Sequence, residues 1–92
     1  MIRSFRHAGL ETFFRVGNKA GIQPHQADKL RLLLASLDNA SGPPDMNAPA
    51  WRLHALSGGL AGHRAVRVNG NWCLTFRFIG TDAELVDYQD YH

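Results

Sequence analysis

Two histidines and one aspartate have the side chains needed to move protons while a phosphodiester bond is cleaved. His54 lies in the segment WRLHAL, and Asp90 and His92 flank Tyr91 at the end of the sequence. The pKa of histidine lies near neutral pH, so histidine can act as a base or as an acid. If these residues converge beside an arginine, they suit RNA cleavage by the ribose 2′-hydroxyl, with the cation stabilising the charge that grows on phosphorus.

Arginines near His54 supply that cation. No acidic residue occurs between residues 45 and 82, and this window contains four arginines: Arg52, Arg64, Arg67 and Arg77. The last three lie on a predicted β-hairpin, so we expect one face of the sheet to be cationic and to bind phosphates. The alternative is a solvated face without a ligand.

A metal or thiol mechanism is not favoured. His54, Asp90 and His92 could ligate a metal, but they provide no closely spaced ligand pair on a helix and no cysteine partner. Cys73 is the single cysteine and has neither a histidine beside it nor a helix N-terminus, so we expect it to be unreactive. We therefore predict neither a metal site nor a reactive thiol.

The length and composition indicate one small globular domain over residues 1–92. A hydrophobic share of 45% excludes a disordered chain, and no apolar run approaches the ~20 residues of a membrane span. The segment after Met1 alternates and carries arginines, so it does not resemble a secretory signal. A lone cysteine fits a reducing compartment. We expect a cytoplasmic protein with no membrane partner.

A strand–turn–strand pattern over residues 63–79 positions three of the arginines. Apolar residues take the even positions, where Arg64 is the one polar exception, and Arg67 and Arg77 take odd positions, so the even face is predicted to be core. A two-residue loop at residues 69–70 would split the apolar set between both faces. We predict a three-residue loop at residues 69–71, with two apolar pairs: Val68–Trp72 and Val66–Leu74.

The remaining segments complete an α+β domain. Helical spacing predicts two amphipathic helices, followed by a strand in WRLHAL, a glycine-rich connection, the hairpin and a last strand. We predict two N-terminal helices packed on one face of a small, mostly antiparallel sheet, in the order β-α-α-β-β-β-β. The elements outside the hairpin are expected at residues 2–6, 8–18, 24–39, 51–56 and 83–92.

Several segments together resemble the HigB killer-protein toxins of bacterial toxin–antitoxin pairs, in the RelE/ParE superfamily. The segments are IRSFRHAGLETFF, KLRLLLASLDNA, WRLHAL, RVNGNW followed by LTFRF, and YQDYH, so the resemblance covers the whole chain. It implies a ribosome-dependent mRNA endonuclease that inhibits translation without a cofactor. It also implies a helix-turn-helix antitoxin, HigA-like, as the inhibitory partner, with operator DNA bound only through that antitoxin.

The resemblance also implies roles for individual residues. The family's catalytic histidine in its L-H motif falls on His54, and its terminal Asp-Tyr-His falls on Asp90, Tyr91 and His92. The arginine of its R-V-N motif falls on Arg67 and would hold the scissile phosphate. His54 and His92 would share the acid and base roles, Asp90 would orient or tune a histidine, and Tyr91 would stack on or hydrogen-bond a base.

Two departures from the family pattern leave alternatives open. Ser57 stands where members often have a basic residue, and Cys73 stands where they have an arginine. Both departures remove positive charge from the phosphate side, so one alternative is a degenerate member that only binds its antitoxin. Another is a non-enzymatic, ParE-like toxin that binds gyrase. His54 and the terminal DYH favour the endonuclease, because a protein-binding toxin needs no proton-transfer groups.

Overall fold

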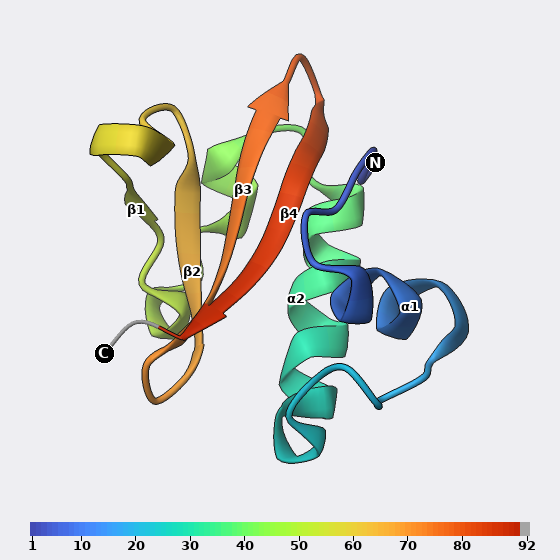
Figure 1. Ribbon diagram of the computed structural model, residues 1–92. Helices are drawn as coiled ribbons and strands as arrows, with labels where there is room; N and C mark the ends of the chain where they lie inside the picture. The colour runs from blue at the N-terminus through green and yellow to red at the C-terminus, as the bar shows by residue number, and fades with distance from the viewer. Residues whose placement is uncertain (91–92) are drawn as a thin grey trace.

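The computed structural model describes residues 1–90 and has an α+β fold (Figure 1). Helices α1 (Ala8–Val16) and α2 (Ala27–Asn39) pack on a four-stranded antiparallel sheet with strand order β1-β2-β3-β4. The predicted architecture is therefore confirmed. The strands are β1 (His54–Ala55), β2 (Arg64–Asn69), β3 (Trp72–Ile79) and β4 (Asp82–Asp90).

The helices begin and end at residues with suitable local chemistry. The His7 side chain caps α1 by accepting a hydrogen bond from the Leu10 amide, at 2.9 Å. Gly17 ends that helix at φ 78°, a left-handed conformation that glycine adopts without strain. Proline opens a 3₁₀ turn, Pro24–Gln26, that leads into α2. The predicted apolar stripe of α2 is buried: Ala27, Leu30, Leu33, Leu34 and Leu37.

The even-numbered residues of the hairpin form the sheet's share of the core, as predicted. Val66, Leu74 and Phe76 are fully buried and belong to one cluster with the apolar residues of α1 and α2. Removing apolar surface from water is the main favourable term in folding, so this layer holds the helices on the sheet. Val66 is paired with Leu74, which is the predicted register.

The predicted hairpin loop was wrong by one residue. Asn69, rather than Val68, is paired with Trp72, so the loop has two residues, Gly70 and Asn71. Val68 is the extra residue of a β-bulge, which absorbs one residue of register and keeps Val68 buried. Gly70 has φ 57°, the sign required at the first central position of a type II′ turn.

The strand predicted at residues 51–56 is much shorter in the structure. Pro49–Trp51 form a 3₁₀ turn, and Arg52 has φ 52°, which interrupts an extended backbone. Only His54 and Ala55 remain as β1, and both are exposed. The alternation of apolar residues in this segment therefore did not give a full strand, because proline and the left-handed Arg52 end the pairing.

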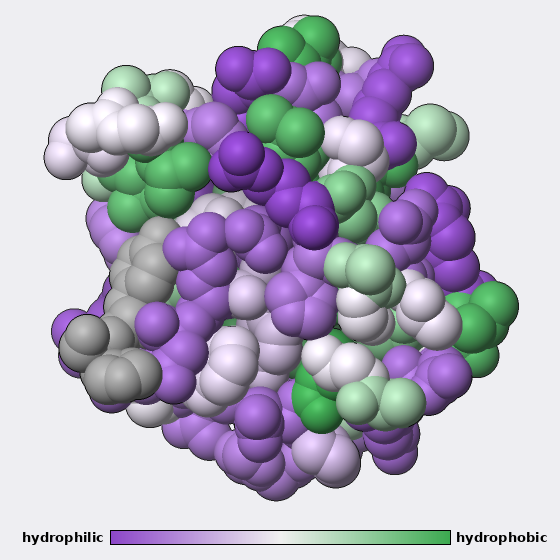
Figure 2. Space-filling model, in the orientation of Figure 1, coloured by the Kyte–Doolittle hydropathy of each residue, from purple (hydrophilic) through white to green (hydrophobic). Residues whose placement is uncertain are grey.

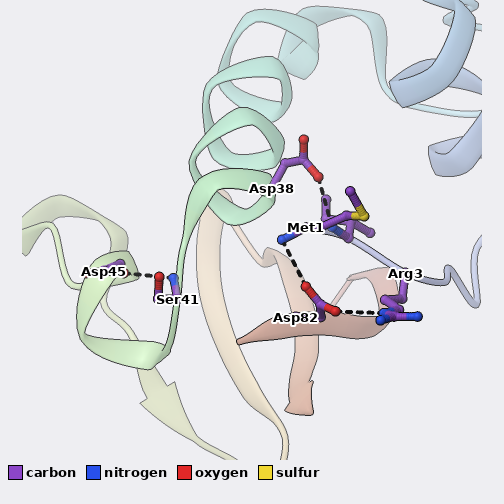
Figure 3. A network of polar contacts seen from close by, with 7 residues as sticks. Met1, Arg3, Asp38, Ser41, Asp45 and Asp82 are labelled. Atoms are coloured by element: carbon purple, nitrogen blue, oxygen red, sulfur yellow. Dashed lines mark hydrogen bonds and ion pairs between the residues drawn. The ribbon is translucent and has the colours of Figure 1, made fainter. Parts of the chain in front are cut away.

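Residues 2–6 were predicted to form a strand. They lie along β4 but form two isolated parallel bridges instead of a ladder: Ile2–Ala83 and Phe5–Val86. Figure 3 shows how the segment is held. Asp82 pairs with the Met1 ammonium at 3.4 Å and with Arg3 Nε at 2.7 Å, while the Ile2 amide donates to Asp38 at 2.8 Å. These bonds tie residues 1–3 to both α2 and β4.

The surface is largely hydrophilic in the orientation of Figure 1, as the purple areas of Figure 2 show. In the part of the chain that the structure describes, no helix has the length and apolar character to cross a membrane. The glycine-rich connection forms a 3₁₀ turn, Gly58–Leu60, between β1 and β2.

Candidate active site

A cleft of about 550 Å³ lies where β1 and the β2–β3 turn come together. Two of the predicted site residues, His54 and Arg67, line this same cleft. A histidine and an arginine in one concavity place a proton-transfer group beside a fixed cation. The full lining is Arg52, Leu53, His54, Arg67, Gly70, Asn71 and Cys73.

His54 is placed by the short strand β1. Its backbone pairs with Ala65 of β2, which holds the residue at the edge of the sheet, and its side chain is exposed. The Nδ1 atom lies 2.8 Å from the carbonyl oxygen of Arg52. This contact restrains an otherwise exposed imidazole ring.

Arg67 is placed by the centre of β2. It lies opposite Cys73 of β3, and its Nε donates a hydrogen bond to the carbonyl of Gly70 at 3.0 Å. This bond uses one of the five N–H donors of the guanidinium and holds the side chain against the hairpin turn. A guanidinium fixed in this way presents a preorganised positive charge to the cleft.

Cys73 also lines the cleft but is suited neither to nucleophilic attack nor to phosphate binding. Burial raises the pKa of the Cys73 thiol, and the nearby charge of Arg67 lowers it by less. The thiol is therefore protonated at neutral pH, and it provides no positive charge. This supports the expectation that Cys73 is unreactive.

The end of β4 reaches the same end of the sheet. Asp90, the last described residue, lies opposite Trp72, which directly precedes Cys73 of the cleft. Trp72 stacks on Tyr88 with ring centroids 4.4 Å apart, and the hydroxyl of Tyr88 donates to Gln26. This buried contact fixes the end of β4 and therefore the position of Asp90. The predicted site residues Tyr91 and His92 lie outside the described residues.

The other two predicted phosphate-binding arginines do not line the cleft. Arg64 lies at the start of β2, on the opposite face of the strand from Arg67 because side chains alternate. Arg77 lies four residues beyond Cys73 along β3 and forms an ion pair with Glu84, with Nε at 2.9 Å from the carboxylate. The structure thus groups Arg67 with His54 and separates Arg64 and Arg77 from them.

Besides Cys73, which was considered and judged unreactive, four cleft residues were not predicted as site residues: Arg52, Leu53, Gly70 and Asn71. Arg52 was noted only as part of the cationic window, although it is two residues before His54 in the same segment. Gly70 and Asn71 were assigned to the turn. Gly70 and Asn71 could have been identified from their closeness to Arg67, because a tight hairpin loop lies next to the residues that precede it.

A second cavity, of about 250 Å³, lies between α1 and α2. Its lining is mostly apolar, including Phe13, Phe14 and Leu34, and contains no histidine or carboxylate. It therefore lacks proton-transfer groups. Within residues 1–90, no group of three or more His, Cys, Asp or Glu side chains could hold a metal ion.

Two crystal structures of YafQ from E. coli share this fold. A histidine-to-glutamine mutant of YafQ is 15% identical, with a TM-score of 0.61 over 98% of this chain and 91% of that chain. YafQ from strain BL21(DE3) is 13% identical, with a TM-score of 0.58 over the same shares. At these identities, the likeness shows the fold.

The sequence comparisons identify the family. The family model "RelE-like toxin of type II toxin-antitoxin system HigB" matches residues 3–92. "Endoribonuclease HigB" of Proteus vulgaris is 36% identical over 92 residues, which are the whole of both chains. The chain therefore belongs to the HigB-like family of RelE-like toxins. As a toxin of a type II toxin–antitoxin system, it has an antitoxin as its partner.

Proposed function

We propose that this protein is a ribosome-dependent mRNA endonuclease that cuts at the cleft containing His54 and Arg67. The observation that carries the proposal is that these two residues, which lie on different strands, line one cleft. The relative of 36% identity is named an endoribonuclease, which supports an activity on RNA. Inhibition of translation follows from cleavage of the message.

In this mechanism, the nucleophile is the substrate's own ribose 2′-hydroxyl, so no metal or cofactor is required. His54 and His92 share the roles of base and acid, and Asp90 orients or tunes a histidine. Arg67 holds the scissile phosphate and stabilises its growing negative charge. Tyr91 stacks on or hydrogen-bonds a base. Arg64 and Arg77 lie outside the cleft, so in this proposal they contact phosphates of flanking nucleotides.

The proposed partners follow from the same activity. The ribosome supplies the aligned message, which converts a search for one conformation of RNA into reaction of a positioned strand. The antitoxin is a helix-turn-helix protein, HigA-like, and operator DNA is bound through it. The proposed setting is the cytoplasm, where ribosomes and messages occur together.

The chemistry can be tested with the purified protein, programmed ribosomes and a short message. The upstream fragment is expected to end in a 2′,3′-cyclic phosphate or its hydrolysed 3′-phosphate. A single deoxyribose at the cut position is expected to block cleavage, because it removes the nucleophile. A matched message with deoxyribose two nucleotides away is the control and should be cut normally.

Two results would contradict the proposal. Normal cutting at the deoxyribose position would exclude attack by the 2′-hydroxyl. Cutting of naked mRNA as fast as ribosome-bound mRNA would exclude ribosome dependence. A folded protein that binds its antitoxin but cuts neither substrate would instead be the degenerate binder to which Ser57 and Cys73 pointed.

A further inference from the structure

Two residues other than glycine have positive φ within residues 1–90: Arg52 (φ 52°) and Leu85 (φ 54°). Residues with a Cβ atom rarely adopt this left-handed conformation. Leu85 lies where the β3–β4 register shifts, and its amide donates to the Ser4 hydroxyl at 2.9 Å. A β-bulge thus accounts for Leu85. Arg52 is the C-cap residue of the 3₁₀ turn before β1, a position at which helices often end in the left-handed conformation.

The left-handed conformation of Arg52 accompanies a contact with the candidate catalytic histidine. The Arg52 carbonyl oxygen lies 2.8 Å from Nδ1 of His54, two residues later. A carbonyl oxygen can only accept a hydrogen bond, so Nδ1 must carry the proton. A neutral imidazole has one N–H, which leaves the lone pair on Nε2.

We propose that Arg52 is a positioning residue whose left-handed backbone holds His54 with Nδ1 protonated, so that Nε2 is the base for the ribose 2′-hydroxyl. This inference rests on the proposed endonuclease function and deepens it. It assigns the base role to His54, whereas the sequence left the two proton-transfer roles open between His54 and His92.

The step balances without an added reactant. Nε2 of His54 takes the 2′-hydroxyl proton, and the electron pair left on that oxygen forms the new bond to phosphorus. The bond from phosphorus to the 5′-oxygen breaks, and this oxygen keeps the electron pair and takes a proton from the acid, His92 in the proposed function. Arg67 lines the same cleft.

The backbone of Arg52, and not its guanidinium, carries this role. Residues in sparsely populated backbone conformations persist where the surrounding structure holds them, and they are common at active sites. In serine proteases, a hydrogen bond to Nδ1 fixes the tautomer of the catalytic histidine, with a carboxylate as the acceptor. Here the acceptor is the peptide carbonyl of Arg52, a residue in the left-handed conformation.

Two substitutions separate the backbone from the side chain. Arg52→Gly and Arg52→Val both remove the guanidinium, but only glycine adopts positive φ readily, while a β-branched residue strongly resists it. The ring nitrogens of His54 are observed by NMR in the full chain, at a pH at which the imidazole ring is neutral and carries one N–H proton. The signals are assigned with a His54→Gln variant, since the chain has five histidines.

The wild-type protein and Arg52→Gly should both show the proton on Nδ1, and Arg52→Val should shift it toward Nε2. On programmed ribosomes, Arg52→Val should cut about tenfold more slowly than Arg52→Gly, which is the size of one net hydrogen bond. If Arg52→Val does not fold, Arg52→Ala takes its place, with a smaller shift in the same direction.

A neutral wild-type His54 with its proton on Nε2 would overturn the inference. So would identical tautomers and cleavage rates in the Gly and Val variants. The NMR result does not depend on cleavage. A protein that cuts no RNA but shows the Nδ1–H form in the wild type and in Arg52→Gly would refute the proposed function and the base role, while the positioning by Arg52 would stand.

Discussion

The two edges of the sheet are built very differently. β4 has nine residues, makes seven residue pairs with β3, and is flanked by the N-terminal segment that Asp82 and Asp38 hold. β1 has two residues and makes two pairs with β2. The buried core lies between the sheet and the helices. The cleft lies at the β1 edge of the sheet.

This difference separates stability from chemistry. Long ladders, buried aromatic contacts and ion pairs concentrate at β3 and β4, so this region is expected to unfold only with the whole protein. The β1 edge is thin and exposed, which allows a large substrate to reach His54. Substitutions in the cleft should therefore change activity with little effect on folding, and substitutions of buried core residues in β3 and β4 should do the opposite.

The largest effect on stability is expected from Phe76→Ala. The side chain is fully buried in the core, so its removal leaves a cavity and should lower the free energy of unfolding by about 3–5 kcal/mol. Urea unfolding measures this change. Arg67→Ala is the control and should leave the melting temperature nearly unchanged. The comparison fails if Arg67→Ala unfolds the protein while Phe76→Ala does not.

A matched pair of arginines sharpens the comparison within one face of the hairpin. Arg67 lines the cleft, whereas Arg77 is paired with Glu84. Arg67→Ala should slow cleavage by about 10²-fold, the loss typical of one group that stabilises transition-state charge. Arg77→Ala should slow cleavage far less, because Arg77 is proposed to contact a flanking phosphate and not the scissile one, and it should cost at most about 1 kcal/mol of stability. Single-turnover cleavage and thermal melts distinguish the two; equal losses of rate would contradict the assignment.

Tyr88→Phe tests the contact that fixes the end of β4. The substitution keeps the stack on Trp72 but removes the buried hydroxyl that donates to Gln26. It should lower the free energy of unfolding by about 1–3 kcal/mol, because the Gln26 oxygen loses its buried partner. Chemical denaturation measures the loss. An unchanged stability would show that this bond does not hold the strand.

A smaller, pH-dependent effect is expected at the N-terminal clamp, which is the pairing of Asp82 with Arg3 and with the Met1 ammonium. The hydrogen bond from Arg3, aided by the N-terminal ammonium, holds the pKa of the Asp82 carboxyl below its usual range. The unfolded chain therefore takes up this proton first, so the clamp's stabilisation is present above about pH 4 and is lost as the pH falls further. Asp82→Asn should differ from the wild type at neutral pH and converge with it in acid. Parallel melting curves at every pH would argue against the clamp.

The regular part of the fold could be predicted from the sequence because its periodicity is local. Leucines spaced at 3.6 residues gave α2, and alternation on β2 and β3 gave the buried face. The bulge at Val68 could not be predicted. A two-residue loop with a bulge at Val68 keeps the apolar residues on one face, and so does the three-residue loop that was predicted. The short β1 could not be predicted either, because Pro49 and the left-handed Arg52 override an alternating pattern.

The candidate site was predictable in its residue types but less so in its grouping. His54 and Arg67 meet because β1 pairs with β2, a nonlocal contact that the hairpin pattern alone does not specify. Arg64, Arg67 and Arg77 were equivalent as charges in the sequence. Strand alternation and the ion pair of Arg77 with Glu84 distinguish them in three dimensions.

The central claim is that the cleft beside the short strand β1 performs the chemistry, and His54→Ala tests it most directly. Single-turnover cleavage of a message on programmed ribosomes should slow by about 10²- to 10⁴-fold, since the variant loses a positioned proton-transfer group. Ribosome binding should be retained, and the free energy of unfolding should change by less than ~0.5 kcal/mol because the side chain is exposed. A folded His54→Ala protein that binds ribosomes and cuts at the full rate would contradict the account.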